Sequence, residues 1–107
     1  MDNEYIIGID VGSTAVKVGL FDAEGNLVHY NSASYPTNRK SESIVEQDPN
    51  HWVKHIVNSL DGFRKKGVKE LSGLSLCSQV NTHVFIDQFG NSLIPAIFWQ
   101  DGRASKE

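Results

Sequence analysis

Asp10 and the turn after it are the residues of this sequence best suited to phosphate chemistry. The apolar segment Tyr5–Ile9 is expected to be a strand that ends at Asp10, and the small or hydroxylated residues Gly12, Ser13 and Thr14 come next. A carboxylate at a strand end is a hard oxygen ligand for Mg2+, directly or through water. A turn with little side-chain bulk lets its backbone N–H groups approach phosphate oxygens. The pattern predicts a metal site at Asp10 and a phosphate site at the turn, while an ordinary hairpin turn is the alternative.

Lys17, three residues beyond the turn, would place a positive charge along the same cleft. Phosphoryl transfer depends mainly on positioning and charge neutralisation, which backbone amides, a metal ion and a cation can supply. The segment has neither the Gly-Lys-Ser/Thr of a P-loop nor the three-glycine fingerprint of dinucleotide-binding folds. A solvated strand lysine is the alternative interpretation of Lys17.

A second polar segment, with Gln79 and Asn81, follows the apolar stretch Leu71–Cys77, which is expected to be a buried strand. The carboxyl ends of strands are where open α/β sheets bind ligands. Side-chain amides both donate and accept hydrogen bonds, so they suit hydroxyl-rich ligands. The alternative is that these amides serve backbone groups. Cys77 is expected to be a small core residue rather than a nucleophile.

A third segment places Trp99, Asp101 and Arg103 just after an apolar stretch. An indole could cover the apolar C–H face of a sugar while the carboxylate accepts hydrogen bonds from its hydroxyls. An Asp–Arg pair on a loop, beside a half-buried Trp, is the alternative. The segment from Val45 to Trp52 is instead expected to be structural, because helix capping and a buried Trp explain most of it.

Three antiparallel strands must position the first turn. The second strand is expected at about Ala15–Phe21, with Val16, Val18 and Leu20 on one face and Lys17 and Phe21 on the other. A third strand runs from Leu27 to about Tyr35, and an exposed loop covers Pro36 to Glu46. The segments 22–26 and 87–91 share the turn pattern Asp-x-x-Gly-Asn.

A helix is expected after Asp48, which can cap it, with Pro49 at its first position and Gly67 as its stop. Trp52, Ile56, Leu60 and Phe63 give it one apolar face. Further strands are expected at Leu71–Cys77, at His83–Ile86 and at Leu93–Phe98, the last an edge or bent strand because of Pro95. This order predicts an α/β unit of the ribonuclease H-like or actin-like type.

Composition limits the protein class. A chain of 107 residues fits one domain, and a net charge of −3 without a basic stripe argues against nucleic acid or a membrane surface as partner. The single cysteine excludes an intrachain disulfide and fits a reducing compartment. Since no signal-peptide pattern or long apolar run is present, a soluble cytoplasmic protein is expected.

Taken together and in order, these segments resemble the amino-terminal part of the FGGY carbohydrate kinase family. The matching residues are Gly8 to Lys17, Val45 to Pro49 with Trp52, Ser78-Gln79, and Pro95 to Ile97 with Trp99, Asp101 and Arg103. The resemblance implies a two-domain sugar kinase with the actin-like ATPase fold, which transfers the γ-phosphoryl group of ATP to a sugar hydroxyl. It implies ATP and Mg2+ as cofactors, a sugar as the small-molecule partner and a possible homodimer of the full-length protein.

The resemblance also implies residue roles. Asp10 would face the metal, and Gly12, Ser13, Thr14 and Lys17 would face the ATP phosphates. The sugar side would be lined by two segments, with Gln79, Val80 and Asn81 in the first and Trp99, Asp101 and Arg103 in the second.

Two departures refine the expectation. Where glycerol kinases have Arg-Glu and xylulokinases typically Met-His, this chain has Val80-Asn81, which disfavours glycerol and leaves xylulose open. The Trp-x-Asp-x-Arg pattern at Trp99, Asp101 and Arg103 resembles the pentulose and hexulose kinases more than the glycerol kinases, so a pentulose or hexulose is expected. Family members run to several hundred residues, and their general-base aspartate and adenosine-binding motifs lie downstream. Residues 1–107 are therefore expected to be the amino-terminal part of the first domain, with no catalytic base and no activity alone. A nuclease of the same superfamily and a non-catalytic binding module or truncated remnant are the alternatives.

Overall fold

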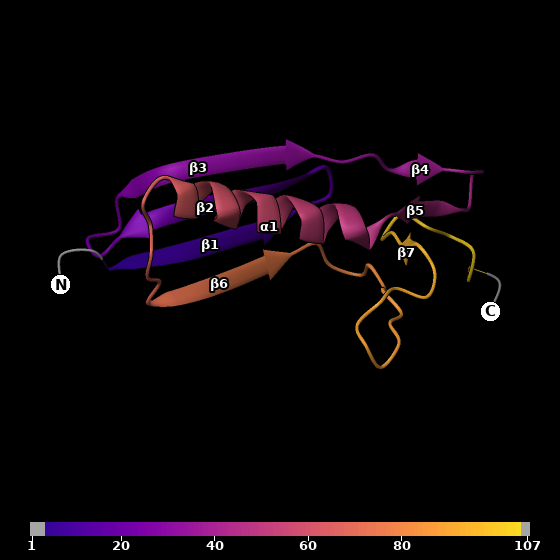
Figure 1. The fold of residues 1–107 in the computed structure, drawn as a ribbon. Coiled ribbons are helices and arrows are strands. Elements are labelled where there is room, and N and C mark those ends of the chain that lie inside the picture. Colours follow the sequence, from indigo (N-terminus) through magenta and orange to yellow (C-terminus); the bar gives the residue numbers. More distant parts are fainter. Residues whose placement is uncertain (1–3, 106–107) are drawn as a thin grey trace.

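Three antiparallel strands and one parallel strand form the main sheet, and a single helix lies across it (Figure 1). The structure is a computed structural model that describes residues 4–105. The main sheet has the order β3-β2-β1-β6, in which β6 runs parallel to β1. Its elements are β1 (Tyr5–Val11), β2 (Ala15–Asp22), β3 (Leu27–Ser34) and β6 (Gly73–Ser78), and the helix is α1 (Pro49–Lys65).

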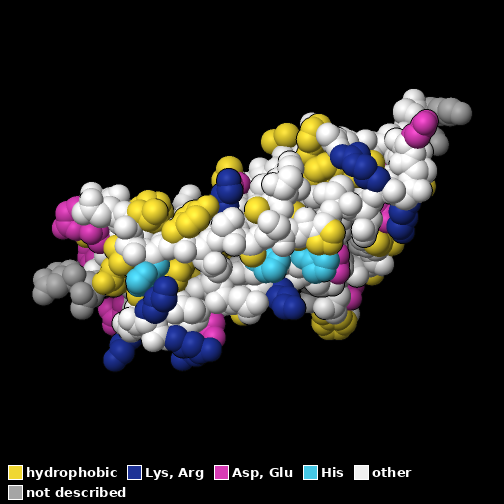
Figure 2. Space-filling model, turned by 90° about the horizontal axis from the view of Figure 1, so that it is seen from above, with side chains coloured by type: hydrophobic (Ala, Val, Ile, Leu, Met, Phe, Trp, Pro, Cys, Tyr) yellow, Lys and Arg dark blue, Asp and Glu magenta, His cyan; other side chains and the backbone are white. Residues whose placement is uncertain are grey.

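A small second sheet extends the molecule beyond the end of β1 and β2 (Figure 1). It has the order β4-β5-β7 and consists of β4 (Asn38–Arg39), β5 (Val45–Gln47) and β7 (Ala96–Ile97). The described part of the chain is elongated, with extents of 56 × 28 × 20 Å. Figure 2 shows separate apolar patches along this length, with charged side chains between them.

The core lies between α1 and one face of β1 and β2. The predicted alternation along β2 is confirmed, since Val16, Val18 and Leu20 are buried and Lys17 is exposed. Ile7, Ile9 and Val11 of β1 complete the buried layer, and α1 contributes Phe63, Trp52, Ile56 and Leu60. The opposite face of the sheet therefore carries Asp10, Lys17 and Phe21.

The helix begins and ends as its sequence signals predict. The Asp48 carboxylate accepts a hydrogen bond of 2.9 Å from the Asn50 N–H, and Pro49 is the first helical residue. Gly67 has φ +102°, a left-handed conformation that lets the chain leave the helix. At 17 residues, α1 is not long and apolar enough to cross a membrane, and no other helix occurs in residues 4–105.

The two Asp-x-x-Gly-Asn turns have the same geometry, as predicted. Asp22 accepts hydrogen bonds from the N–H groups two and four residues later at 3.0 and 2.8 Å, and Asp87 does so at 2.8 and 2.9 Å. Gly25 and Gly90 both have φ +86°.

The expectation of a buried strand at Leu71–Cys77 was wrong about burial. The strand forms over Gly73–Ser78, but every residue in it is exposed, Cys77 included. Leu74 and Leu76 are 53% and 62% exposed, because β6 lies at the edge of the sheet and α1 packs over β1 and β2 instead. An apolar pattern shows which side chains favour burial. Only the tertiary arrangement decides whether a helix packs over them.

Three boundary predictions also need correction. The expected loop Pro36–Glu46 contains β4 and the start of the buried strand β5. His83–Ile86 is not a strand, because its pairing is limited to the isolated bridges His83–Ile97 and Ile86–Ser92. Leu93–Phe98 shortens to β7, which begins directly after Pro95. Short strands of this kind depend on distant partners, which local patterns do not identify.

Candidate phosphate and sugar site

The Gly12–Thr14 turn closes the end of the β1–β2 hairpin. The Gly12 N–H donates to the Ala15 carbonyl at 3.0 Å, and the Thr14 carbonyl accepts from the Tyr35 N–H at 3.2 Å. Just before the turn, Asp10 and Lys17 are direct partners across the two strands, and both side chains are exposed. The predicted metal ligand and the predicted cation therefore lie side by side, next to the predicted phosphate turn.

The carbonyl groups of the turn point into the protein and are fully used there. The Gly12 carbonyl accepts from the Tyr35 hydroxyl and, at 3.1 Å, from Nε2 of Gln79. The Ser13 carbonyl accepts from Nε2 of Gln47 at 2.9 Å. Three side chains from distant parts of the chain thus hold two consecutive carbonyls.

Gln47 and Gln79, together with Thr37 and Thr82, form what we call the amide cluster. Nε2 of Gln47 also donates to Oγ1 of Thr37 at 2.8 Å, and Oε1 of Gln47 accepts from Nε2 of Gln79 at 3.1 Å. Oε1 of Gln79 accepts from Oγ1 of Thr82 at 2.7 Å. Gln47 is only 1% exposed, and every polar atom of its side chain has a partner. A fully satisfied network of this kind makes a local geometry rigid.

The direction of the carbonyls determines where the N–H groups of the turn point. In a trans peptide the C=O of one residue and the N–H of the next lie on opposite sides, and none of the described peptide bonds is cis. Because the Gly12 and Ser13 carbonyls face the amide cluster, the N–H groups of Ser13 and Thr14 face away from it. Neither donates a hydrogen bond to any atom of residues 4–105. Successive outward N–H groups of a turn can bind an anion, so the arrangement is compatible with the predicted phosphate site, which stays a prediction.

Tyr35 supports the turn as a neutral hydrogen-bond donor. Burial, followed by the nearby Asp10 carboxylate, raises the pKa of the Tyr35 hydroxyl to about 12. The ring packs against Trp52 and His55 of α1. The hydroxyl therefore keeps its proton at physiological pH and continues to donate to the Gly12 carbonyl.

Trp99 connects the third predicted segment to the same turn. Its Nε1–H donates to the Ser13 hydroxyl at 3.1 Å, and its ring packs against Phe98 with 5.4 Å between centroids. The residue remains 46% exposed, so part of the indole is available to a ligand.

Asp101 and Arg103 form an ion pair beside Trp99. This is the Asp–Arg loop pair that the sequence offered as the alternative to a sugar site. The Arg103 guanidinium donates to the Asp101 carboxylate at 2.7 and 2.8 Å and to Glu46 at 2.9 Å. The Val45 N–H donates to Oδ2 of Asp101 at 2.6 Å. Hydrogen bonds from Arg103, and with them the backbone donors, hold the pKa of Asp101 well below its usual range.

Val80 and Asn81, the remaining residues predicted on the sugar side, lie in the segment directly after β6. Val80 is 73% exposed, and Asn81 has a left-handed backbone with φ +55° and is exposed. Both positions are thus free of packing, in contrast to their neighbour Gln79. Their contact with a ligand stays a prediction.

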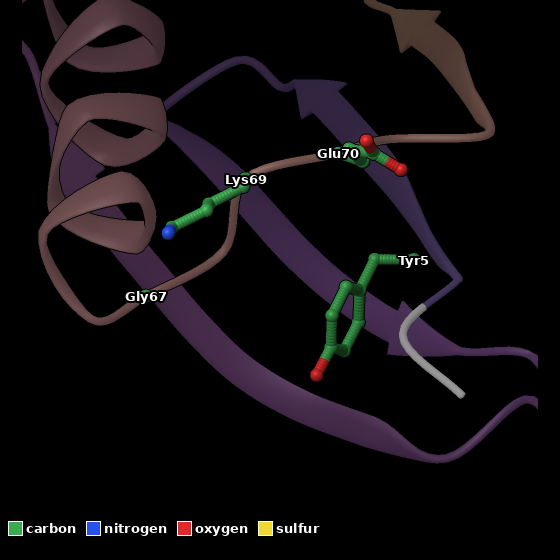
Figure 3. A pocket seen from close by; sticks show the side chains of 4 residues that line it. All are labelled: Tyr5, Gly67, Lys69 and Glu70. Atoms are coloured by element: carbon green, nitrogen blue, oxygen red, sulfur yellow. The ribbon is translucent and has the colours of Figure 1, made fainter. Parts of the chain in front are cut away.

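One surface hollow adjoins Asp10 and Lys17, and another lies apart from them. Asp10 and Lys17 line an open cavity of about 380 Å³ on the sheet face opposite α1, together with Phe21 and Cys77. A second hollow of about 410 Å³ is lined by Tyr5, Gly67, Lys69 and Glu70 (Figure 3). Tyr5 is five residues before Asp10, roughly 17 Å along the strand, so this second hollow is separate from the candidate site.

The sequence of the chain is similar to sequences of known carbohydrate kinases. A sequence profile described as "FGGY family of carbohydrate kinases, N-terminal domain" matches residues 5–107. The chain belongs to the FGGY family of carbohydrate kinases. The FGGY chain is 36% identical over 104 residues to the xylulose kinase of Staphylococcus xylosus, covering 96% of this chain and 22% of that protein. It is 31% identical over 101 residues to the gluconokinase of Bacillus subtilis, covering 94% of this chain and 20% of that protein.

The fold of the FGGY chain matches solved structures of the same family. The ligand-bound xylulose kinase from Lactobacillus acidophilus superposes with a TM-score of 0.86 at 28% identity, over 96% of this chain and 21% of that one. The expected actin-like ATPase fold, present as part of a domain, is thus confirmed. The chain spans about a fifth of the length of the relatives it matches.

The structure adds site residues of the FGGY chain that the sequence did not reveal as such. Gln47 lies in the segment that was expected to be structural, and its side chain holds the Ser13 carbonyl from 34 residues away. Tyr35 was expected only as the end of a strand, but its hydroxyl donates to the Gly12 carbonyl. The motif from Val45 to Pro49 contains Gln47, but nothing local in the sequence identifies the contact that Gln47 or Tyr35 makes with the turn, because these contacts depend on the tertiary fold.

Proposed function

We propose that the complete protein is an ATP-dependent carbohydrate kinase that transfers the γ-phosphoryl group of Mg-ATP to a hydroxyl of a sugar, with a pentulose or hexulose as the expected substrate. Support comes from relatives named xylulose kinase and gluconokinase. In this reaction the bond between the γ-phosphorus and its bridging oxygen breaks, and a bond to the sugar oxygen forms. The base that takes the hydroxyl proton is expected outside residues 1–107.

The single observation that carries the proposal is the outward pair of N–H groups at Ser13 and Thr14, beside Asp10 and Lys17. Two preorganised N–H donors stabilise phosphate charge without reorganisation during the reaction. Lys17 adds a positive charge on the neighbouring strand.

The donor set at Asp10 fits Mg2+ bound with ATP. Magnesium in such sites usually keeps several waters and takes one or two carboxylates together with substrate phosphates. Asp10 offers one exposed carboxylate, and residues 4–105 contain no cluster of three or more acidic, His or Cys side chains that could hold a metal without other ligands. Bound there, Mg2+ would neutralise phosphate charge, and Asp10 would hold it directly or through water.

The sugar is proposed to lie against Trp99, with Val80 and Asn81 as further contacts. Trp99 is well placed for this role, because its N–H is held by Ser13 while part of its ring stays exposed. A sugar stacked on that ring would lie next to the phosphate turn. Asp101 and Gln79 have their polar atoms engaged within the protein, so their sugar contacts would require a rearrangement.

The remaining expectations belong to the same proposal. Residues 1–107 would be the amino-terminal part of the first domain of a cytoplasmic enzyme, acting on small molecules rather than on nucleic acid or membranes. A homodimer of the complete protein is compatible with this function.

The test is an assay of the complete protein for ADP release with Mg-ATP across ketoses, polyols and aldonates. We expect sugar-stimulated turnover, highest with a pentulose or hexulose. Asp10→Ala should abolish turnover and leave the fold intact, whereas Asp61→Ala, which removes an exposed α1 carboxylate paired with Arg64 and Lys65, should retain it. No turnover on the whole panel would refute the kinase proposal and favour a binding module.

A further inference from the structure

We infer that Gln47 is a positioning residue for phosphoryl transfer: its buried amide holds the turn carbonyls inward, so that the Ser13 and Thr14 N–H groups face the phosphates. The inference rests on the proposed function and extends it to a residue that contacts neither substrate. The geometry involves one direct contact, to the Ser13 carbonyl at 2.9 Å, and one indirect contact, through Gln79 to the Gly12 carbonyl.

The turn needs such support because its own sequence does not hold its peptide planes. Gly12 lacks a Cβ and has the widest choice of backbone conformations. Within the turn, the hydrogen bond from the Gly12 N–H to the Ala15 carbonyl restrains only the first peptide plane, the one that enters the turn. The orientation of the next two peptide planes depends on the contacts that their carbonyls make with Gln79, Tyr35 and Gln47.

Gln47 is suited to this role by its own environment. It is the last residue of β5, after the buried residues Val45 and Glu46 and directly before the helix cap Asp48. At 1% exposure its amide cannot exchange partners with water, and Thr37 and Gln79 hold the orientation of its two polar atoms. The side chain is thus a fixed donor rather than a mobile one.

Loss of the donor should affect the phosphate side first. If the Ser13 carbonyl is released, its peptide plane can rotate and carry the Thr14 N–H away from the phosphate. A displacement of about 1 Å at a reacting group can lower the rate about 100-fold. The sugar side should be affected less, because Trp99 is connected to the turn through the Ser13 hydroxyl, which has no contact with Gln47.

The test compares two variants of the complete protein with a matched control. Gln47→Glu keeps the size and the acceptor for Gln79 but loses the donors to Ser13 and Thr37, and Gln47→Met keeps the size without any hydrogen bond. Ser59→Ala is the control, because Ser59 is also a buried polar residue with two hydrogen bonds, to His55 and Asn31, away from the turn.

We expect both Gln47 variants to lower kcat about 10- to 100-fold, with the sugar KM changed less than about threefold. Ser59→Ala should keep kcat within about twofold, even if its unfolding midpoint falls as far as the midpoints of the Gln47 variants. A loss of kcat only in the Gln47 variants would then reflect positioning rather than stability. Amide hydrogen exchange with and without Mg-ATP gives a second readout: nucleotide should protect Ser13 and Thr14 in the unmodified protein but less in Gln47→Glu.

Two results would overturn the inference. If the unmodified protein turns over and a folded Gln47 variant matches Ser59→Ala in kcat and in protection of the turn amides, Gln47 is structural only. If the unmodified protein shows no sugar-dependent turnover, the proposed function fails and the inference fails with it. The two failures are distinguished by the unmodified protein alone.

Discussion

The Nε1–H of Trp99 donates to the hydroxyl of Ser13 at 3.1 Å, across 86 positions of sequence. One residue belongs to the segment predicted to bind sugar, and the other to the turn predicted to bind phosphate. The contact places the segment predicted to bind sugar next to the turn predicted to bind phosphate. Transfer of a phosphoryl group from ATP to a sugar requires the two substrates to lie this close together.

Replacement of Trp99 should separate its two contributions. Trp99→Phe removes the N–H donor and keeps an aromatic ring, so we expect kcat/KM for the sugar to fall about 3- to 10-fold, the equivalent of one ordinary hydrogen bond. Trp99→Ala also removes the ring and should lower kcat/KM at least about tenfold further. Steady-state kinetics on the complete protein measure both, and equal effects of the two variants would contradict a role for the ring.

Tyr35→Phe should destabilise the chain and change its behaviour at alkaline pH. The unfolded-state pKa of a Tyr hydroxyl is about 10, and the folded value is raised to about 12. The unfolded chain therefore loses this proton first as the pH rises, so the contribution of Tyr35 to stability is present below pH 10 and is lost between about pH 10 and 12.

Urea unfolding at pH 8, 10 and 11.5 measures this effect. The unmodified chain should lose stability more steeply over this range than Tyr35→Phe, which has no such proton. At pH 8 the variant should be less stable by about 1 kcal/mol for the lost hydrogen bond to Gly12. Parallel curves for the two proteins would contradict the assignment.

Asp101→Asn should show the opposite dependence on pH. The pKa of Asp101 is lowered by Arg103 and by backbone donors, so its carboxylate stabilises the fold above the ordinary value near 4 and this contribution is lost as the pH falls further. We expect the variant to unfold roughly 5 °C lower at pH 7. Between pH 4 and pH 2 the difference from the unmodified protein should shrink, which thermal unfolding by circular dichroism can follow.

Two leucines test where the helix covers the sheet. In the 107-residue chain Leu20 is fully buried beneath α1 and Leu76 is 62% exposed on β6. Leu20→Ala should cost about 2–5 kcal/mol of unfolding free energy, as for other core truncations. Leu76→Ala should cost less than about 0.5 kcal/mol, as for a surface position. Comparable losses in denaturant unfolding would show that α1 or another element also covers β6.

Much of the local structure follows from the sequence alone. The period of two along β2, the Asp48 cap and the Gly67 stop of α1, and the paired Asp-x-x-Gly-Asn turns are determined by nearest neighbours, so their residues suffice to predict them. The motifs around Asp10 and Trp99 likewise identified the family, because each motif keeps its own residues at short spacing.

The tertiary structure alone decided whether β6 is covered and how the site is assembled. Leu74, Leu76 and Cys77 look like core residues in sequence, but they are exposed because α1 packs on β1 and β2. Gln47 looks like part of a helix entry, but folding carries it to the Ser13 carbonyl. Patterns along a chain report which side chains favour burial or a partner, whereas the partner itself is chosen by contacts between residues far apart in sequence.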